Sequence, residues 1–161
     1  MPITAAEFRL ALRHFPAGVT VVTTRHADGR PCGLTLSAFT SVSLDPPLVL
    51  VCIDHAATAY RAFIESGWFA VNVLGKSQEH LSRRFATTAT DKFAGIAFRE
   101  GQAGLPILDD VVAALECRVV HQYAGGDHTI FVGQVEVVSV TGGPPLVYFR
   151  GAYHHLETDH P

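Results

Sequence analysis

The sequence predicts a mainly β protein, an antiparallel β-barrel with a few peripheral helices. Six or seven segments rich in Val, Ile, Thr and aromatic residues recur along the 161 residues. Most of these segments are joined by short turn sequences, which indicates hairpins and therefore antiparallel pairing. Only two or three short helical patterns lie between them. Closure into a barrel is a common way for such a chain to remove exposed strand edges.

The first third of the chain predicts one helix and three strands. A capping box at Thr4 and Glu7, followed by apolar residues at near-helical spacing, predicts a helix that ends near His14. The segment GVTVVTT, the turn sequence HADGRP and the segment CGLTLSAF predict a hairpin. The run PPLVLVCI is apolar on both faces, so we expect a central strand with its prolines at the entrance.

The rest of the chain predicts two short helices and four strands. The segment from His55 to Gly67 has the pattern of a helix with a glycine C-cap, and WFAVNVL follows as a strand. Ser77 is expected to cap the short helix QEHLSRRF. Residues 86–110 are expected to form a long, partly ordered excursion. The segments VVAALECRVVHQY and HTIFVGQVEVVSV predict two long strands joined by AGGD, and PLVYF predicts a last strand.

Size and charge limit the possible partners. A chain of 161 residues, 48% of them hydrophobic, predicts a single domain, 1–161. The net charge is −3 and there is no run of Lys or Arg, so nucleic acid is not an expected partner. No apolar span approaches the roughly 18 residues of a membrane helix, and Glu7, Arg9 and Arg13 interrupt the start of the sequence. We therefore expect no membrane association and a cytoplasmic protein.

Several common site motifs are missing from the sequence. The three cysteines lie far apart and form no CxxC pair, so reduced thiols are expected rather than disulfides or a zinc site. His154, His155 and His160 lie in a polar tail without the spacing of a metal site, and no metal is predicted. The sequence GKS lacks the first P-loop glycine, because Ala70 stands there, and no GxGxxG follows a strand.

A row of hydroxyl groups is the main candidate for a binding surface. Read as one strand, residues 35–43 place Thr35, Ser37 and Phe39 on a single face, followed by Ser41 and Ser43 if pairing continues. This face is either the solvent side of a sheet or a set of neutral donors and acceptors for a flat heteroaromatic ligand.

The ligand interpretation includes a phosphate end. Thr58 and the amides of the helix start after Asp54 would meet the phosphate, and Arg83 or Arg84 would neutralise its charge. His128 in the sequence GGDH stands at the start of a long strand beside two glycines. It is either a functional residue at a point of close approach or an exposed side chain in an ordinary hairpin turn.

Six stretches of the sequence, taken in order, resemble one known family. They are FPAGVTVVTT, GLTLSAFTSVSLDPPLVLVCID, FAVNVL, SRRFA with DKFAG, GDHTIFVGQVEVV and PLVYFRGAYHHL. They resemble the flavin reductase family with the FMN-binding split-barrel fold, and within it the short-chain reductase components of two-component monooxygenases. The resemblance covers about residues 8–156. It implies an antiparallel Greek-key barrel and a homodimer that binds FMN or FAD at a subunit boundary. It also implies NADH or NADPH as hydride donor, and a monooxygenase that receives the reduced flavin.

By position, the resemblance also implies the residues of a flavin pocket. Those near the ring and ribityl chain would be Thr20, Ser37, Ala38, Phe39, Cys52, Ile53 and Asp54. Those around the phosphate end would be Thr58, Arg84 and Phe85, while Tyr153 would help to close the pocket. His128 is implied to orient the nicotinamide rather than to act as an acid or base. Hydride transfer between two stacked rings needs no protein nucleophile or metal.

The resemblance leaves several alternatives open. The motifs do not fix the choice between FMN and FAD or between NADH and NADPH. A flavoprotein that retains its FMN and reduces another acceptor, such as a corrin cobalt centre or an iron complex, would share them. A non-catalytic flavin-binding module would share the barrel without turnover.

Overall fold

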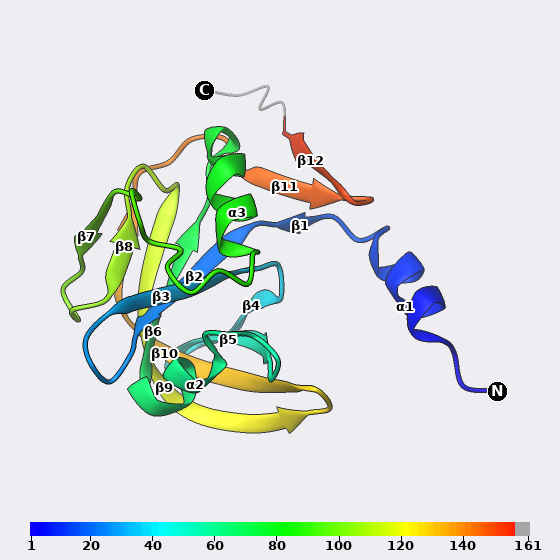
Figure 1. Ribbon diagram of the computed structural model, residues 1–161, viewed down its shortest axis with the longest axis horizontal. Helices are drawn as coiled ribbons and strands as arrows, with labels where there is room; N and C mark the ends of the chain where they lie inside the picture. The colour runs from blue at the N-terminus through cyan, green and yellow to red at the C-terminus, as the bar shows by residue number, and fades with distance from the viewer. Residues whose placement is uncertain (157–161) are drawn as a thin grey trace.

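Strands dominate the computed structural model, which describes residues 1–156 (Figure 1). His160 of the predicted polar tail lies outside the described residues. The helices are α1 (Ala5–Leu12), α2 (Tyr60–Ser66), α3 (Glu79–Phe85) and a single 3₁₀ turn, η1 (Lys76–Gln78). The strands are β1 (Ala17–Gly18), β2 (Thr20–Arg25), β3 (Pro31–Leu36), β4 (Phe39–Leu44), β5 (Pro47–Asp54), β6 (Trp68–Val73), β7 (Phe98–Glu100), β8 (Pro106–Leu108), β9 (Ala113–Gly125), β10 (His128–Val140), β11 (Leu146–Phe149) and β12 (Ala152–His155).

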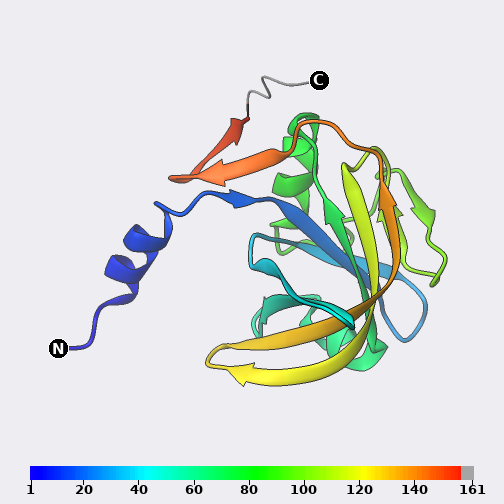
Figure 2. The same cartoon turned by 180° about the vertical axis from the view of Figure 1, so that it is seen from behind.

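One curled antiparallel sheet forms the body of the molecule. Its seven strands lie in the order β3-β2-β6-β9-β10-β5-β4, and two smaller sheets, β1-β11-β12 and β7-β8, flank it (Figures 1 and 2). Leu34 of β3 and Val49 and Val51 of β5 belong to one buried cluster, although their strands lie near opposite ends of the sheet. The sheet therefore curls round a shared interior and stays open between β3 and β4. This confirms the predicted mainly β, antiparallel fold.

Two cores lie on opposite faces of the middle strands. Val22 of β2 and Phe69 of β6 point into the barrel interior, which α2 closes with Phe63. Val21 of β2 belongs to a second core under α3 and the segment after it. Strands β2 and β6 are thus buried on both faces, whereas β5 buries alternate residues only. The predicted strand PPLVLVCI lies between β10 and β4 rather than at the middle of the sheet, and the alternate residues on its outer face are only half-buried.

The predicted strand CGLTLSAF is broken in the structure. β3 ends at Leu36 and pairs with β2, while β4 begins at Phe39 and pairs with β5. The chain crosses from one end of the sheet to the other at Ser37 and Ala38, which are exposed. The hydroxyl row expected over residues 35–43 is therefore not one continuous face. A register shift in β4, between residues 41 and 43, interrupts it further.

The helices agree with their predicted positions but not with all their predicted caps. The capping box of Thr4 and Glu7 is present, and Gly67 ends α2 with φ 70°. α2 begins at Tyr60, later than the start near His55 that the sequence predicted. The turn before η1 is closed by the Gln78 side chain, so Ser77 is not the predicted cap.

Helix α1 projects away from the barrel (Figures 1 and 2). None of its residues is buried, and Phe8 and Leu12 expose about half of their surface. Phe15, just after the helix, is 75% exposed. The near-helical apolar spacing predicted the helix correctly, but its apolar side chains do not pack on the described body of the same chain.

Residues 86–112 are more ordered than predicted. They contain the β7-β8 hairpin, and Phe93, Ile107 and Leu108 are buried in the second core. Asn72 on β6 accepts a hydrogen bond from the Leu108 amide, and the Thr23 hydroxyl donates to the Pro106 carbonyl. Buried polar side chains of the main sheet thus hold the excursion in place.

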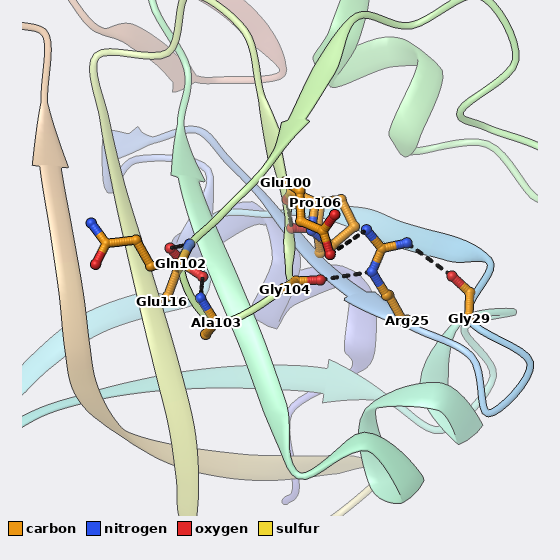
Figure 3. A network of polar contacts seen from close by, with 9 residues as sticks. Arg25, Gly29, Glu100, Gln102, Ala103, Gly104, Pro106 and Glu116 are labelled. Carbon is orange, nitrogen blue, oxygen red and sulfur yellow. Dashed lines mark hydrogen bonds and ion pairs between the residues drawn. The ribbon is translucent and has the colours of Figure 1, made fainter.

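A second set of polar contacts fixes the turn of this hairpin (Figure 3). Glu116 of β9, only 4% exposed, accepts hydrogen bonds from the amides of Gln102 and Ala103 at 2.9 and 2.8 Å. Arg25 of β2 donates from Nε to the Gly104 carbonyl at 2.7 Å. The hairpin turn is therefore anchored to two strands of the sheet.

The C-terminal half agrees with the predicted hairpin and adds a strand. β9 and β10 pair along most of their length, and together they extend beyond the barrel body (Figure 2). β12 was not predicted as a strand, because His154 and His155 were assigned to a polar tail. The segment AYHH is too short to predict a strand by itself, and β12 exists through its pairing with β11.

Candidate functional site

The crossing between β3 and β4 lies beside the ends of two other strands. The Ala38 carbonyl accepts a hydrogen bond from the Cys52 amide at 3.2 Å. Across the next pair of strands, Cys52 lies opposite Ile130, and Asp54 lies opposite His128. Sequence segments 37–39, 52–54 and 128 thus come together at the open side of the barrel. These are the segments that the resemblance assigns to the ring and to the nicotinamide.

His128 is held by its neighbour. Its Nδ1 lies 2.6 Å from Oδ1 of Asp127, and its side chain is 39% exposed. The hydrogen bond from His128 lowers the pKa of Asp127 below its usual value. With Nδ1 engaged by the carboxylate, Nε2 is the ring nitrogen left to meet a ligand.

A cavity of about 220 Å³ lies on the other side of the crossing and contains a hydroxyl network. Thr35, Ser37, Ser82 and Tyr153 line it. The Thr35 hydroxyl donates to the Ser82 carbonyl at 2.6 Å, and the Ser82 hydroxyl lies 2.7 Å from the Tyr153 hydroxyl. Arg83 covers the Tyr153 ring, with 5.0 Å from its guanidinium carbon to the ring centre. Of the predicted hydroxyls, Ser37 therefore keeps its side chain available, while Thr35 holds α3 against β3.

A second cavity, of about 160 Å³, adjoins Thr58. Its other lining side chains include His26, Arg30, Cys32 and Lys92. The Thr58 side chain is exposed to this cavity, as expected for a residue that meets an anionic group. α2 begins only at residue 60, later than the helix start expected after Asp54, and the Ala56 amide already donates to the Asp54 side chain.

Lys92 is a buried cation in this cavity. It is 8% exposed, and its Nζ donates to the carbonyls of Gly33 and Phe85 at 3.3 and 3.0 Å. Burial lowers the pKa of Lys92. Arg30, the other nearby cation, forms an ion pair with Asp28 at 2.8 Å. The cavity thus offers positive charge next to a free hydroxyl.

Three predicted residues contribute buried side chains rather than a ligand surface. Ile53 and Phe85 are completely buried in the two cores. Thr20 is 3% exposed, and its hydroxyl donates to the Leu36 carbonyl at 2.8 Å. None of these three side chains is available to contact a ligand.

Two other predicted residues lie away from the cluster or are already engaged. Ser43 is opposite Leu48, near the far end of β4. Arg84 donates to the carbonyls of residues 91, 92 and 94, and so fixes the loop that carries Lys92. Arg84 is therefore a positioning residue for that loop. The basic side chains that line the cavity next to Thr58 are Arg30 and Lys92.

Sequence reasoning also missed a polar cluster beneath His128. The Thr129 hydroxyl lies 2.8 Å from the Tyr60 hydroxyl and 3.1 Å from Nε2 of His55. It joins the start of β10 to α2 and the turn before it. No local pattern marks these residues, because they are more than 60 positions apart. Lys92, by contrast, lies in the DKFAG stretch that the resemblance already contained.

The described part of the chain contains no group of three or more His, Cys, Asp or Glu side chains arranged to hold a metal ion. Within residues 1–156, no helix is long and apolar enough to cross a membrane.

Comparison with known proteins gives consistent matches over nearly the whole chain. The family described as "Flavin reductase like domain" matches residues 12–157. The reductase component of a 4-nitrophenol 4-monooxygenase/4-nitrocatechol 2-monooxygenase from Rhodococcus opacus is 44% identical over 96% of this chain and 83% of its own. A flavin reductase (NADH) from Kitasatospora aureofaciens is 48% identical, over 86% of this chain and 74% of its own.

The solved structures agree with these sequence matches. The NADH:FAD oxidoreductase SgcE6 from Streptomyces globisporus C-1027, in complex with NAD and FAD fragments, superposes with a TM-score of 0.89. The two sequences are 34% identical, and the superposition covers all of both chains. Some matched proteins are longer, and this chain spans 47% of two of them.

Proposed function

This chain belongs to the flavin reductase like domain family, and on that premise we propose that it is an NAD(P)H:flavin oxidoreductase. It transfers a hydride from NADH or NADPH to FMN or FAD, and it supplies the reduced flavin to a partner monooxygenase. The observation that carries this proposal is the meeting of residues 37–39, 52–54 and 128 at the open side of the barrel. The proposal keeps the cytoplasmic location that the sequence led us to expect.

The residues at the open side fit a flavin. A flat ring system needs an apolar floor and neutral hydrogen-bonding groups, and here Cys52, Ile130 and Phe39 are half-buried beside the Ser37 hydroxyl. The phosphate end needs positive charge, which Lys92 supplies in the cavity next to Thr58. Burial raises the pKa of the Cys52 thiol, so this side chain stays a neutral contact.

The protein positions the flavin and nicotinamide rings and supplies no reactive group of its own. When bound, the flavin supplies the redox chemistry by accepting a hydride from the nicotinamide. Segment 37–39 and the end of β5 fix one ring, and His128 places the other ring against it through Nε2. Asp127 holds His128 in the orientation that leaves Nε2 facing the ligand. Holding two reactants at near-attack distance is the main contribution such a site makes to the rate.

Reduced flavin must leave if it is to reach a monooxygenase. The site is an open surface between strand ends rather than an enclosed chamber, which favours exchange. We expect a dissociation constant near the micromolar range, about −8 kcal/mol of binding free energy. Equilibrium dialysis of oxidised and reduced flavin measures it, and release slower than turnover would instead support a flavoprotein that keeps its flavin and reduces another acceptor.

A homodimer is part of the proposal. Helix α1 buries none of its residues on the described chain, and Val42 and Leu44 of β4 are 49% and 94% exposed. Apolar surface of this kind favours a protein contact, and a second copy would also close the open side of the barrel. Sedimentation velocity should give a dimer, and the substitution Leu44→Glu should shift it toward the monomer.

The direct test is a steady-state assay that crosses FMN, FAD and riboflavin with NADH and NADPH. Oxidation of the nicotinamide that depends on added flavin is the expected result. A yellow protein that binds flavin without oxidising either nicotinamide would instead support a non-catalytic binding module. Rapid reduction of a cobalt or iron complex with poor reduction of free flavin would support a different acceptor.

A further inference from the structure

The tip of the β9-β10 hairpin carries His128 but has little packing of its own. Residues 124–127 are exposed, and Thr129 is the first buried side chain after the turn, with 8% of its surface exposed. Gly126 has φ 72°, and beyond its two chain neighbours no described atom lies within 4 Å of the position that a Cβ would take there. An exposed turn at the end of an extended hairpin (Figure 2) is mobile unless specific contacts hold it. The contacts that hold this tip therefore decide where His128 lies.

His55 contacts the chain on both sides of His128. It lies in the turn after β5, next to Asp54, the residue that pairs with His128. The His55 amide donates to the Asp127 carbonyl at 3.0 Å. Its ring nitrogen Nε2 lies 3.1 Å from the Thr129 hydroxyl. One residue thus joins the body of the barrel to the positions immediately before and after His128.

Tyr60 of α2 provides a third contact. Its hydroxyl lies 2.8 Å from the Thr129 hydroxyl, and its ring centre lies 5.0 Å from that of His55. A threonine hydroxyl donates one hydrogen bond and accepts others, so it can bond to both partners at once. Tyr60 is itself packed against the barrel core, where its ring meets the edge of Phe131. His55, Tyr60 and Thr129, named here the Thr129 clamp, thus tie the hairpin tip to the core.

The clamp also bears on the orientation of the His128 ring. The ring is held through Nδ1 by the Asp127 carboxylate, at 2.6 Å. The Asp127 side chain is 88% exposed, so packing does not fix it. Its place depends on the backbone of residue 127, which the His55 amide holds. The position of Nε2 of His128 therefore depends on contacts made by the turn after β5.

From these observations we propose that the three residues of the Thr129 clamp are positioning residues, which hold Nε2 of His128 where it meets the nicotinamide. The proposal rests on the proposed function, since it takes His128 to orient that ring. Small displacements of a reacting ring from its near-attack position slow a transfer strongly. Flavin binding should depend less on the clamp, because the segment at Ala38 is held separately, through the Cys52 amide.

Thr129→Val is the main variant, because it removes the hydroxyl and with it both side-chain contacts. Tyr60 is half-buried and His55 is exposed, so the groups that lose their partner can reach solvent and the fold should persist. Tyr60→Phe removes only one contact and should have a smaller effect, whereas Thr129→Ser keeps the hydroxyl and should behave as the natural protein. Thr24→Val is the matched control, since the buried Thr24 hydroxyl donates to the Trp68 carbonyl in another part of the sheet.

Steady-state kinetics test the role of the clamp. Thr129→Val should raise the KM for the nicotinamide nucleotide roughly fivefold, the equivalent of one hydrogen bond, and change the flavin dissociation constant less than about twofold. The decisive comparison adds the same substitution to His128→Ala. If the clamp acts through His128, Thr129→Val should have little further effect once the imidazole is gone. Equal fold-changes in the two backgrounds would overturn the proposal. So would an unchanged KM, an equal loss of flavin binding, or an equal effect of Thr24→Val.

A measurement that needs no turnover separates this proposal from the proposed function. NMR relaxation reports the order of the backbone amides of Asp127 and His128. Both amides should be ordered in the natural protein and in Thr24→Val, and more mobile in Thr129→Val. If the protein reduces no flavin but the amides follow this pattern, the clamp stands as the device that fixes His128, and the reductase function fails. If flavin is reduced and Thr129→Val changes neither the order nor the KM, the reductase function stands and the clamp is rejected.

Discussion

The buried carboxylate of Glu116 should be a major anchor of the β7-β8 hairpin. Its two oxygens accept hydrogen bonds from two backbone amides, and the side chain is 4% exposed. In Glu116→Gln one oxygen becomes an NH₂ group, which cannot accept, so one buried amide loses its partner. A hydrogen bond to a charged group contributes about 1.5–3 kcal/mol, so we expect the free energy of unfolding to fall by about 2–3 kcal/mol. For a domain of this size the melting temperature should drop by roughly 5–10 °C.

Urea denaturation is the assay, and the denaturation midpoint should fall with an unchanged m-value. Hydrogen exchange at the amides of Gln102 and Ala103 should become faster, because these are the donors that Glu116 satisfies. Glu136→Gln is the matched control, since Glu136 forms an exposed ion pair with Arg118. This substitution should change the free energy of unfolding by less than about 0.5 kcal/mol. Equal, small changes in the two variants would refute the role assigned to Glu116.

Three further predictions follow from the site and the cores. Lys92→Met removes the donor from two buried carbonyls and should lower the free energy of unfolding by about 2 kcal/mol; a midpoint in urea equal to that of the natural protein would contradict this. His128→Ala should raise the KM for NADH more than it weakens flavin binding by fluorescence titration, and equal losses in both would reject its assigned role. Burial raises the pKa of Cys32 and of Cys117 to about 12, so the folded state holds these protons after the unfolded state has lost them. Stability should therefore decline as the pH rises from about 9 toward 12, less steeply in Cys32→Ala, and an identical decline in that variant would exclude the thiol as a cause.

Local interactions made part of the fold predictable. The capping box of Thr4 and Glu7 spans three positions, and the glycine at the end of α2 acts through its own backbone, so both can be read directly from the sequence. The β9-β10 hairpin was predictable for the same reason. The break after Leu36 was not, because β4 takes its partner, β5, at the far end of the sheet from β3. Hydroxyl periodicity alone does not reveal that the chain changes its position in the sheet.

The strand buried on both faces is β2, although β5 is the more apolar of the two. The sequences of the two strands do not show which one a second layer will cover. The covering layer is α3 with residues 86–112, a segment whose mixed composition suggested partial order. Its order depends on Asn72 and Glu116, which lie in other strands.

The sequence indicated segments that come together in the structure, but not which basic side chains surround Thr58. Segments 37–39 and 52–54 lie close to His128. Lys92 lines the cavity next to Thr58, and only the tertiary fold brings it there. Arg84, assigned there from sequence, bonds to the loop that carries Lys92. Tertiary packing decides which of several basic side chains faces a cavity. Their spacing along the sequence does not reveal the choice.

The pairing of β5 with β10 has a consequence for how the chain folds. Asp54 meets His128 only after more than 70 intervening residues have been made and ordered, so the two halves of the barrel must find each other across a long loop. Proteins dominated by such non-local pairings fold in milliseconds to seconds rather than microseconds. During synthesis, the β5 edge of the β4-β5 hairpin stays unpaired until β10 has been synthesised. The nascent chain is most prone to aggregation in this interval.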